Sequence, residues 1–265
     1  MTSPVVAALF DIHANLPALQ ATLDDVERAG ADVVVIGGDV VFGPMPGATL
    51  DRLADLGERA RFVRGNTDRL VADAYESWGA GRLPRGDGPE PLPVPAWAAK
   101  RLTPAHRERL ARLEPTITLA VPGLGDVLFC HATPRSDEEI VTPRTPDPRV
   151  AAALAEASAP LVVAGHTHVQ FDRVVGERRL VNAGSVGMPF EDEPGAYWAL
   201  LADGEVSLRR TAYDHERAGA SILATGYPEA EELVRESLLE PIGRDRAAAL
   251  FEELGAANGE PFAFP

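Results

Sequence analysis

The chain has little that would tie it to a membrane or to an oxidising compartment. Cys130 is the only cysteine among 265 residues, so no intrachain disulfide can form. The absence of disulfides fits a reducing compartment, because structural disulfides are typical of secreted proteins. No stretch approaches the roughly 20 apolar residues of a membrane-spanning helix. The first residues show no signal peptide, and we therefore expect a cytoplasmic protein without membrane association.

Positive charge is also scarce. The 25 Lys and Arg residues face 40 Asp and Glu residues, which gives a formal net charge of -15. This charge argues against bulk binding of nucleic acid or anionic membrane. A small phosphorylated substrate stays compatible, because bound cations can reverse the local field. Acidic residues outnumber basic ones by nine to three over residues 229–260, which predicts a solvated helical face, with an interaction tail as the alternative.

Strand and helix patterns alternate along the first half of the chain. We expect strands at 5–10, 33–36 and 61–64, and helices between 15 and 30, at 48–56 and at 66–75. This alternation predicts parallel strands with helical crossovers. In residues 79–95, nine of seventeen positions are Gly or Pro, and we interpret them as an exposed loop, with a lid as a further interpretation.

The second half is richer in predicted strands. They fall at 116–121, 127–130, 161–164, 169–175, 180–182, 197–201 and 206–212. A helical stretch at 97–113, which Thr103-Pro104 restarts midway, precedes them, and two helices at about 229–239 and 244–254 follow. The pattern predicts an α/β protein of two packed sheets with outer helices. We expect one domain over 1–265, with acidic helices at about 228–256 as an appendage.

Six short polar motifs lie mostly just after apolar strand-like runs. Side chains at the carboxyl ends of neighbouring strands converge on one crevice. Two aspartates, four histidines and one asparagine would suit two divalent cations that share a bridging carboxylate. The motifs are Asp11-Ile-His13, Gly38-Asp39, Gly65-Asn66, His131, Gly165-His166-Thr167-His168 and Asn182-Ala183-Gly184-Ser185.

Each motif also has an ordinary explanation when taken alone. Asp11 and Asp39 could be turn residues, and Asn66 could cap a helix. The histidines could be satisfied or exposed residues at strand ends. Four of the six histidines in the chain nevertheless fall within these motifs, which favours a common metal site.

The order and spacing of the motifs resemble the calcineurin-like metallophosphoesterase family. The family pattern Asp-x-His, Gly-Asp, Gly-Asn, His, Gly-His-x-His runs here from Asp11 to His168, and a weaker resemblance reaches Tyr213. Asp-Ile-His-x-Asn and Asn-x-Gly-Ser-Val-Gly are similar to the small bacterial phosphodiesterase-type branch. The resemblance implies a four-layer α-β-β-α sandwich of two mixed sheets flanked by helices.

The resemblance also implies a dinuclear metal centre. One ion would take Asp11, His13, Asp39 and His168, and the other Asp39, Asn66, His131 and His166. We expect Mn²⁺, with Fe, Zn²⁺ or Ni²⁺ as alternatives. A hydroxide that bridges the two metals would attack a phosphate ester, most readily a phosphodiester. Asp39 and Asn66 are therefore also expected to be catalytic, whereas Cys130 is expected in the core.

Thr67 departs from the family pattern. Most members carry His directly after Gly-Asn, and that residue is thought to stabilise the transition state or to protonate the leaving oxygen. A threonine hydroxyl donates a hydrogen bond but is no general acid near neutral pH. We therefore expect either weak turnover or substrates whose leaving group needs little protonation. Small bacterial relatives that carry Cys there are regarded as phosphodiesterases, which favours an active enzyme with Thr67 in the catalytic set.

Two residues are candidates for substrate contacts. Arg135 could bind a phosphate oxygen in bidentate fashion, or it could be a surface residue paired with Asp137 or Glu138. Asn15 could reach the phosphate, or it could only cap a helix. Asn182, Gly184 and Ser185 are expected to brace the His166/His168 loop.

Two other functions stay open at this point. A metallophosphoesterase-like scaffold or binding protein would keep the fold without useful turnover, and only Thr67 supports it. A Ser/Thr-protein or dinucleoside polyphosphate phosphatase would share the metal motifs. The sequence leaves the oligomeric state undetermined.

Overall fold

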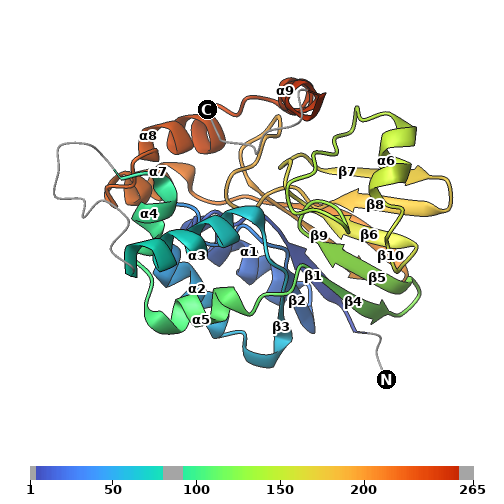
Figure 1. Cartoon of the computed structure of the whole chain (residues 1–265), viewed down its shortest axis with the longest axis horizontal. Coiled ribbons are helices and arrows are strands. Elements are labelled where there is room, and N and C mark those ends of the chain that lie inside the picture. Colours follow the sequence, from blue (N-terminus) through green and yellow to red (C-terminus); the bar gives the residue numbers. More distant parts are fainter. Residues whose placement is uncertain (1–3, 80–91, 257–265) are drawn as a thin grey trace.

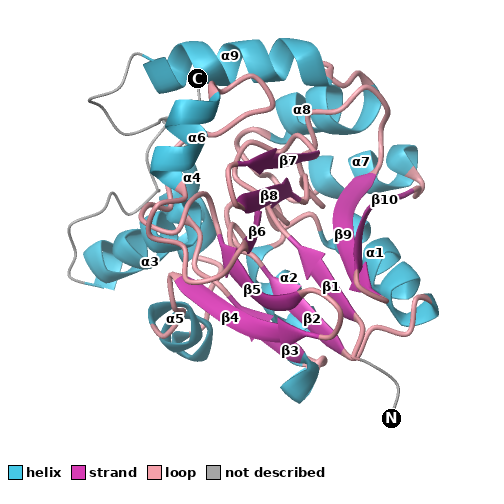
Figure 2. Cartoon of the chain, turned by 90° about the vertical axis from the view of Figure 1, so that its right-hand side faces the viewer, coloured by secondary structure: helices cyan, strands magenta, loops and turns pink. Residues whose placement is uncertain are grey.

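The fold consists of two five-stranded sheets that pack face to face between outer helices. In the computed structural model, residues 4–79 and 92–256 are described. Helices lie outside both sheets (Figure 1), so the predicted four-layer α-β-β-α arrangement of two mixed sheets is confirmed. Figure 2 shows the strands in magenta, enclosed by the helices in cyan.

The first sheet has the strand order β10-β9-β1-β2-β3. Its strands are β1 (Val6–Leu9), β2 (Val33–Ile36), β3 (Ala60–Phe62), β9 (Ala196–Ala202) and β10 (Glu205–Thr211). β1, β2 and β3 are parallel, and α1 (Leu16–Arg28) and α2 (Pro46–Ala54) with the short 3-10 helix η1 (Gly57–Arg59) connect them. The parallel arrangement brings the carboxyl ends of these three strands to one edge.

The second sheet has the order β4-β5-β6-β8-β7. Its strands are β4 (Thr116–Val121), β5 (Gly125–Cys130), β6 (Leu161–Ala164), β7 (Phe171–Val175) and β8 (Arg178–Asn182). β5, β6 and β8 are parallel, and hairpins add β4 and β7 at the two edges. Helix α6 (Asp147–Ala153), which the sequence pattern did not predict, covers the outer face and buries Cys130 there as expected.

The remaining helices lie mostly on the side of the first sheet. They are α3 (Asn66–Gly79), α4 (Val94–Ala99), α5 (Pro104–Ala111), α7 (His215–Leu223), α8 (Ala230–Leu233), the π-helix η2 (Val234–Leu239) and α9 (Arg244–Ala256). The predicted restart within 97–113 is confirmed, because Thr103 caps a new helix that begins at Pro104. Most of the predicted loop 79–95 lies outside the described residues, and its last two positions already belong to α4.

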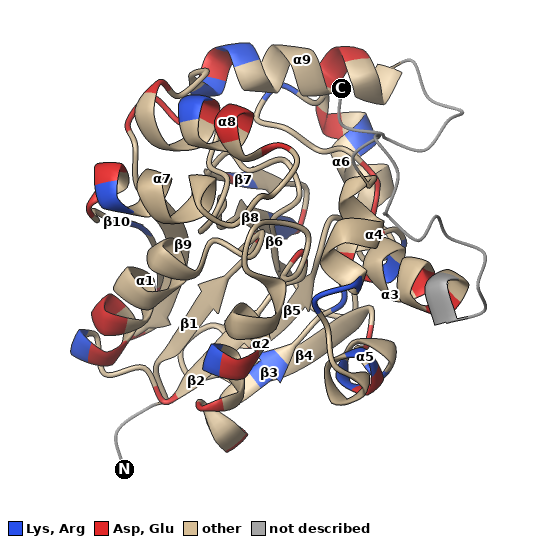
Figure 3. Cartoon of the chain, turned by 90° about the vertical axis from the view of Figure 1, so that its left-hand side faces the viewer, with Lys and Arg blue, Asp and Glu red and all other residues tan. Residues whose placement is uncertain are grey.

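Separate apolar clusters hold the layers together. Phe10 and Phe129 lie in the cluster between the two sheets. Leu233, Val234 and Leu238 join the core between the first sheet and its helices, so α8 and η2 pack directly on that layer. Figure 3 shows acidic residues on α8 and both acidic and basic residues on α9. None of the described helices is long and apolar enough to cross a membrane.

Candidate metal centre

All seven predicted ligands gather where the carboxyl ends of strands from both sheets meet. Those after β1, β2 and β3 belong to the first sheet, and those after β5 and β6 belong to the second. Every one is buried, and His166 is the most exposed at 5%. The seven predicted ligands are Asp11, His13, Asp39, Asn66, His131, His166 and His168.

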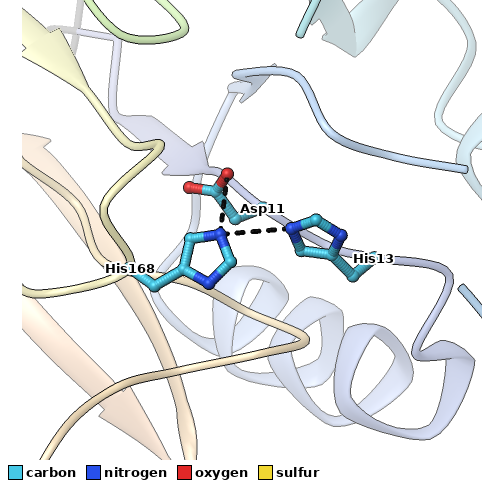
Figure 4. Close-up of side chains that lie close together, drawn as sticks. All are labelled: Asp11, His13 and His168. Atoms are coloured by element: carbon cyan, nitrogen blue, oxygen red, sulfur yellow. Dashed lines mark hydrogen bonds and ion pairs between the residues drawn. The ribbon is translucent and has the colours of Figure 1, made fainter. Parts of the chain in front are cut away.

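Asp11, His13 and His168 form one half of this cluster (Figure 4). The Nε2 atoms of His13 and His168 lie 3.1 Å apart. Asp11 Oδ1 lies 3.4 Å from His168 Nε2 and has no hydrogen-bond partner among the described residues. A buried carboxylate oxygen without a hydrogen bond is costly, and a cation at this point would satisfy it.

His131 is the centre of the other half. Its Nε2 lies 3.0 Å from Asn66 Oδ1 and 3.5 Å from Asp39 Oδ1. The His166 ring lies beside it, with ring centroids 5.1 Å apart. Asn66 is the first residue of α3, so its amide oxygen faces this cluster from the start of a helix.

Asp39 connects the two halves through its two carboxylate oxygens. Oδ1 lies 3.5 Å from His131 Nε2, whereas Oδ2 lies 3.7 Å from His13 Nε2. The backbone N–H of Thr67 also donates to Oδ1 at 3.0 Å, which fixes the orientation of the carboxylate. One carboxylate therefore faces both groups of ligands.

Backbone carbonyls orient three of the four histidines through their Nδ1 atoms. His13 Nδ1 lies 3.0 Å from Phe42 O, His131 Nδ1 lies 3.0 Å from Gly37 O, and His168 Nδ1 lies 2.7 Å from Met188 O. A carbonyl oxygen only accepts, so Nδ1 carries the proton that it donates in each case. Each Nε2 is left facing the cluster, which is the arrangement that outer partners impose on metal-ligating histidines.

His166 has the opposite ring orientation. Its Nε2 lies 3.2 Å from Glu138 O, so Nε2 donates and Nδ1 is the nitrogen left for a ligand. Its backbone N–H donates to Asp11 Oδ2 at 2.8 Å, so His166 links the two halves by its main chain as well.

The backbone is strained at the site. Five of the predicted ligands have positive φ: Asp11 (52°), His13 (46°), Asp39 (53°), His166 (70°) and His168 (56°). This region is uncommon for residues other than glycine and costs about 1–3 kcal/mol when the residue is held there. Strain of this kind persists where the surroundings fix it, and it is typical of functional sites.

The glycines of the Gly-Asn and Gly-His motifs provide the space for the aspartates. A Cβ atom on Gly65 would lie 2.1 Å from Asp39 Oδ1, and one on Gly165 would lie 2.3 Å from Asp11 Oδ2. Any side chain at either position would displace a ligand carboxylate. These glycines are therefore required for the geometry of the site, although they have no side chain that could bind a metal or substrate.

Asn182 braces the His166/His168 loop, as predicted, whereas Ser185 braces the loop of Asp11. Asn182 Nδ2 donates to Gly165 O at 2.6 Å, and Ser185 Oγ donates to Asp11 O at 2.7 Å. A third brace is Asp68, whose carboxylate accepts backbone N–H groups from the Asp39 and Asn66 loops. The loops that carry the ligands are thus tied to one another independently of any cation.

The charges within the cluster suit cation binding. Burial would raise the pKa of both Asp11 and Asp39, but the imidazoles of His168 and His131 beside them hold each pKa below its usual range. Burial lowers the pKa of His13 and of His166 to about 4. Ionised carboxylates and neutral imidazoles are the forms that bind metals.

His131 is the exception among the histidines. Burial lowers its pKa, but the carboxylates of Asp39 and Asp11 raise it to about 10. Its Nε2 therefore carries a proton when no cation is present. Metal binding releases such protons.

The predicted substrate contacts have protein partners in this structure. Both oxygens of Glu139 bind the Arg135 guanidinium, whereas Asp137 and Glu138 bind Arg69 instead. The expected surface pair was therefore assigned to the wrong acids, because the turn after His131 brings Glu139 back beside Arg135. A contact between Arg135 and phosphate stays a prediction.

Asn15 and Thr67 are both buried. Asn15 Oδ1 accepts the Ala18 N–H at 3.2 Å, and Nδ2 donates to Gly187 O at 2.9 Å, so the amide caps α1 and holds a neighbouring loop. Its contact with substrate stays a prediction. Thr67 Oγ1 has no hydrogen-bond partner in the described part of the chain.

Sequence reasoning missed the groups that orient the ligands. The carbonyls of Gly37, Phe42 and Met188 gave no signal, because every residue has a carbonyl. Phe190 was missed too, and its ring stacks on His168 with centroids 4.9 Å apart and 24° between the planes. The nearby run Asn182–Gly187 could have drawn attention to this loop.

A comparison of the sequence with protein-family profiles assigns the chain to a family. The profile of the calcineurin-like phosphoesterase superfamily domain matches residues 5–204. The chain belongs to the calcineurin-like phosphoesterase superfamily. As a member of this metal-dependent family, it is a hydrolase that acts on phosphoric ester bonds.

Individual relatives agree with this assignment. An uncharacterized protein of Methanocaldococcus jannaschii is 26% identical over 254 residues, which covers 86% of this chain and 96% of that protein. The crystal structure of a metallophosphoesterase from Sphaerobacter thermophilus is 25% identical with a TM-score of 0.69, and the match covers 88% of this chain and 97% of that one. A hypothetical protein of Pyrococcus horikoshii shares the fold at 20% identity, with a TM-score of 0.74 and coverage of 89% and 98%.

Proposed function

We propose that this calcineurin-like phosphoesterase is a phosphodiesterase with a dinuclear divalent metal centre. The observation that carries the proposal is the position of Asp39, whose two oxygens face His131 on one side and His13 on the other. A carboxylate in this position can serve two cations at once. Both halves offer carboxylate and imidazole donors, and amide oxygen adds to the second half.

The proposed ligands fall into two sets. Asp11, His13, Asp39 and His168 would hold one cation, and Asp39, Asn66, His131 and His166 would hold the other. The unsatisfied Asp11 Oδ1 and the three histidines with outward-bonded Nδ1 support this fit. Oxygen and imidazole donors without a thiolate suit Mn²⁺, with Fe, Zn²⁺ or Ni²⁺ as alternatives.

The bound cations would provide Lewis-acid polarisation of the phosphoryl group and a lower pKa for water. The protein's own part is to position these groups. Asp39 is held by the Thr67 N–H, and Asn66 faces the same region from the first turn of α3. The cluster lies among buried side chains, where electrostatic interactions are stronger than in water.

Thr67 favours esters with a good leaving group. A histidine at this position would be able to protonate a leaving oxygen, but the hydroxyl of Thr67 cannot do so near neutral pH. Aryl phosphodiesters need little protonation of the leaving group, which is why we infer a diesterase that acts on esters of this kind. A placement in the small bacterial phosphodiesterase-type branch and a cytoplasmic location both stay predictions.

The alternative functions lack a specific observation in their favour. A scaffold would have no need of the oriented histidines and the shared carboxylate. A Ser/Thr-protein or dinucleoside polyphosphate phosphatase would use the same cluster and is not distinguished by it. Phosphodiester hydrolysis therefore stands as the proposed activity.

The test compares bis(p-nitrophenyl) phosphate with p-nitrophenyl phosphate as substrates. We expect Mn²⁺-dependent hydrolysis that prefers the diester and stops when a chelator is added. Asp39→Asn should lower the rate by more than about a hundredfold, the upper end of the effect of losing an outer-shell partner. Asp126→Asn, at an exposed position near the start of β5, is the matched control. Metal-independent activity or an unaffected Asp39→Asn variant would overturn the proposal.

A further inference from the structure

We propose that an apolar cavity beside the His13/His168 half of the centre binds an organic ammonium group of the substrate. The preferred substrate would then be a phosphodiester in which one ester group carries an alkylated ammonium cation. This inference rests on the proposed function for the position of the phosphate, and it assigns the chemical class of the group attached to it.

Aromatic rings dominate the wall of the cavity. It has a volume of about 280 Å³, and Phe42, Phe190, Tyr227 and Phe251 all line it. Met188 and Leu233 add flexible and branched aliphatic surface. This volume is close to the lower limit of small-molecule sites, which is about 300 Å³. It therefore suits a small headgroup better than a long chain.

The cavity lies directly against the candidate metal ligands. The Phe190 ring stacks on His168, and the Phe42 ring meets the edge of His13 with centroids 6.3 Å apart. The carbonyls of Phe42 and Met188 also accept the Nδ1–H groups of these same two histidines. The Phe42 and Phe190 rings thus lie between the cavity and the two imidazoles, and the proposal places the phosphate at the centre and a short ester group in the cavity.

The charges at the cavity are all negative among the residues that line it in the described ranges. Glu229, Glu232 and Glu236 line it, and neither Lys nor Arg does. The Tyr227 hydroxyl donates to Glu229 Oε2 at 3.2 Å, so one carboxylate is held at the edge of an aromatic ring. Aromatic faces attract cations, and carboxylates add to that attraction. An anionic or strongly hydrated group would be repelled.

The C-terminal segment supplies most of the residues that line this cavity. Phe42, Met188 and Phe190 belong to the family domain, which is matched over 5–204, whereas Tyr227, Leu233 and Phe251 follow it. The π-helix η2 carries Glu236 to the cavity, and π-helical turns are frequent at functional sites. The catalytic domain is thus extended by a surface that adds selectivity and leaves its chemistry unchanged.

Two chromogenic diesters with the same leaving group test the inference. The first is p-nitrophenyl phosphorylcholine, and the second is p-nitrophenyl 3,3-dimethylbutyl phosphate, which has carbon in place of the ammonium nitrogen. We expect kcat/KM to be at least about tenfold higher for the cationic ester, as a partly desolvated cation–π contact would give. Equal values, or a preference for p-nitrophenyl thymidine 5′-phosphate, would overturn the inference.

A pair of variants locates the effect. Glu232→Gln removes a carboxylate that lines the cavity, and Glu231→Gln removes its exposed neighbour on α8, which does not line it. We expect Glu232→Gln to abolish most of the preference through KM, with little change for the neutral ester. Glu231→Gln should retain the preference. Equal effects of both variants would mean that the Glu232 carboxylate in the cavity does not cause the preference for the cationic ester.

Binding separates this inference from the proposed function. Tetraethylammonium binding can be followed by calorimetry with a chelator present, and by the fluorescence of Trp97, whose ring lies 5.2 Å from that of Tyr227. If the protein hydrolyses no ester but binds tetraethylammonium, and Glu232→Gln weakens this binding, the cavity assignment is supported and the proposed activity fails. Hydrolysis of the neutral diester without cation binding would overturn the cavity assignment alone.

Discussion

Asp68 Oδ1 accepts a hydrogen bond of 2.8 Å from the backbone N–H of Val40. The same atom accepts the Val41 N–H at 3.2 Å, and Oδ2 accepts the Gly65 N–H at 3.2 Å. A residue of α3 thereby joins the loop after β2 to the loop after β3. Asp39 and Asn66 lie on these two loops, so Asp68 controls their separation.

Asp68→Asn should loosen both loops. An amide offers one oxygen, so its NH₂ group must face either the Gly65 N–H or the N–H groups of Val40 and Val41. Leaving a buried donor unsatisfied costs about 1–3 kcal/mol, which denaturant unfolding would detect. Loss of such an outer partner should also lower Mn²⁺ affinity by about 10–100-fold, as calorimetry would measure. Asp73→Asn, exposed on the same helix, should change neither quantity.

Thr67→His should broaden the range of leaving groups. A positioned general acid contributes typically about 10²–10⁴-fold, and its benefit is largest for alkyl phosphate esters. We expect faster turnover of alkyl esters and little change for aryl esters, measured with thermal unfolding as a check on folding. Thr67→Val, which removes only the hydroxyl, is the control. Unchanged or slower hydrolysis of alkyl esters by Thr67→His would contradict this account.

Metal binding should stabilise the fold measurably. The cluster contains two buried carboxylates whose repulsion a cation would relieve. At a free Mn²⁺ concentration 100 times Kd, the free energy of unfolding should rise by about 2.7 kcal/mol. Calorimetric scans with and without chelator would show this, and Asp39→Asn should abolish most of the rise. A transition temperature that is insensitive to Mn²⁺ in the wild type would argue against the metal centre itself.

Glu252→Ala should weaken the attachment of α9. Glu252 Oε1 accepts from Thr142 Oγ1 at 2.7 Å, and Oε2 lies 3.2 Å from Arg149 Nη1. Removing this carboxylate leaves the partly buried threonine hydroxyl without its acceptor, and we expect faster cleavage of the C-terminal segment in limited proteolysis. Glu253→Ala, an exposed neighbour, should be cleaved like the wild type. Equal cleavage rates for both variants would show that Glu252 does not secure the helix.

Elements with continuous apolar runs were predictable from the sequence. The bounds of β4 and β6 were predicted correctly. β3 ends two residues earlier than expected, because Val63 makes only an isolated bridge to Glu114. Helix α6 was not predicted, because its seven residues hold too few turns for a clear apolar period.

The ligand side chains were easier to predict than their surroundings. Aspartate and histidine at strand ends are visible in a sequence, and the structure brings all seven predicted residues together. The carbonyls that orient the histidines, and the pairing of Arg135 with Glu139, depend on how loops meet in space. The division of the chain into one domain with a C-terminal appendage stays a prediction.

The position of the site between two sheets has a consequence for the order of biosynthesis. The first sheet supplies ligands up to Asn66, but the second supplies His131, His166 and His168. The carbonyl that orients His168 comes only at Met188. A nascent chain that ends before residue 188 therefore lacks a complete, oriented ligand set, however long its amino-terminal half has been free of the ribosome. We therefore expect metal loading only after most of the chain has been synthesised.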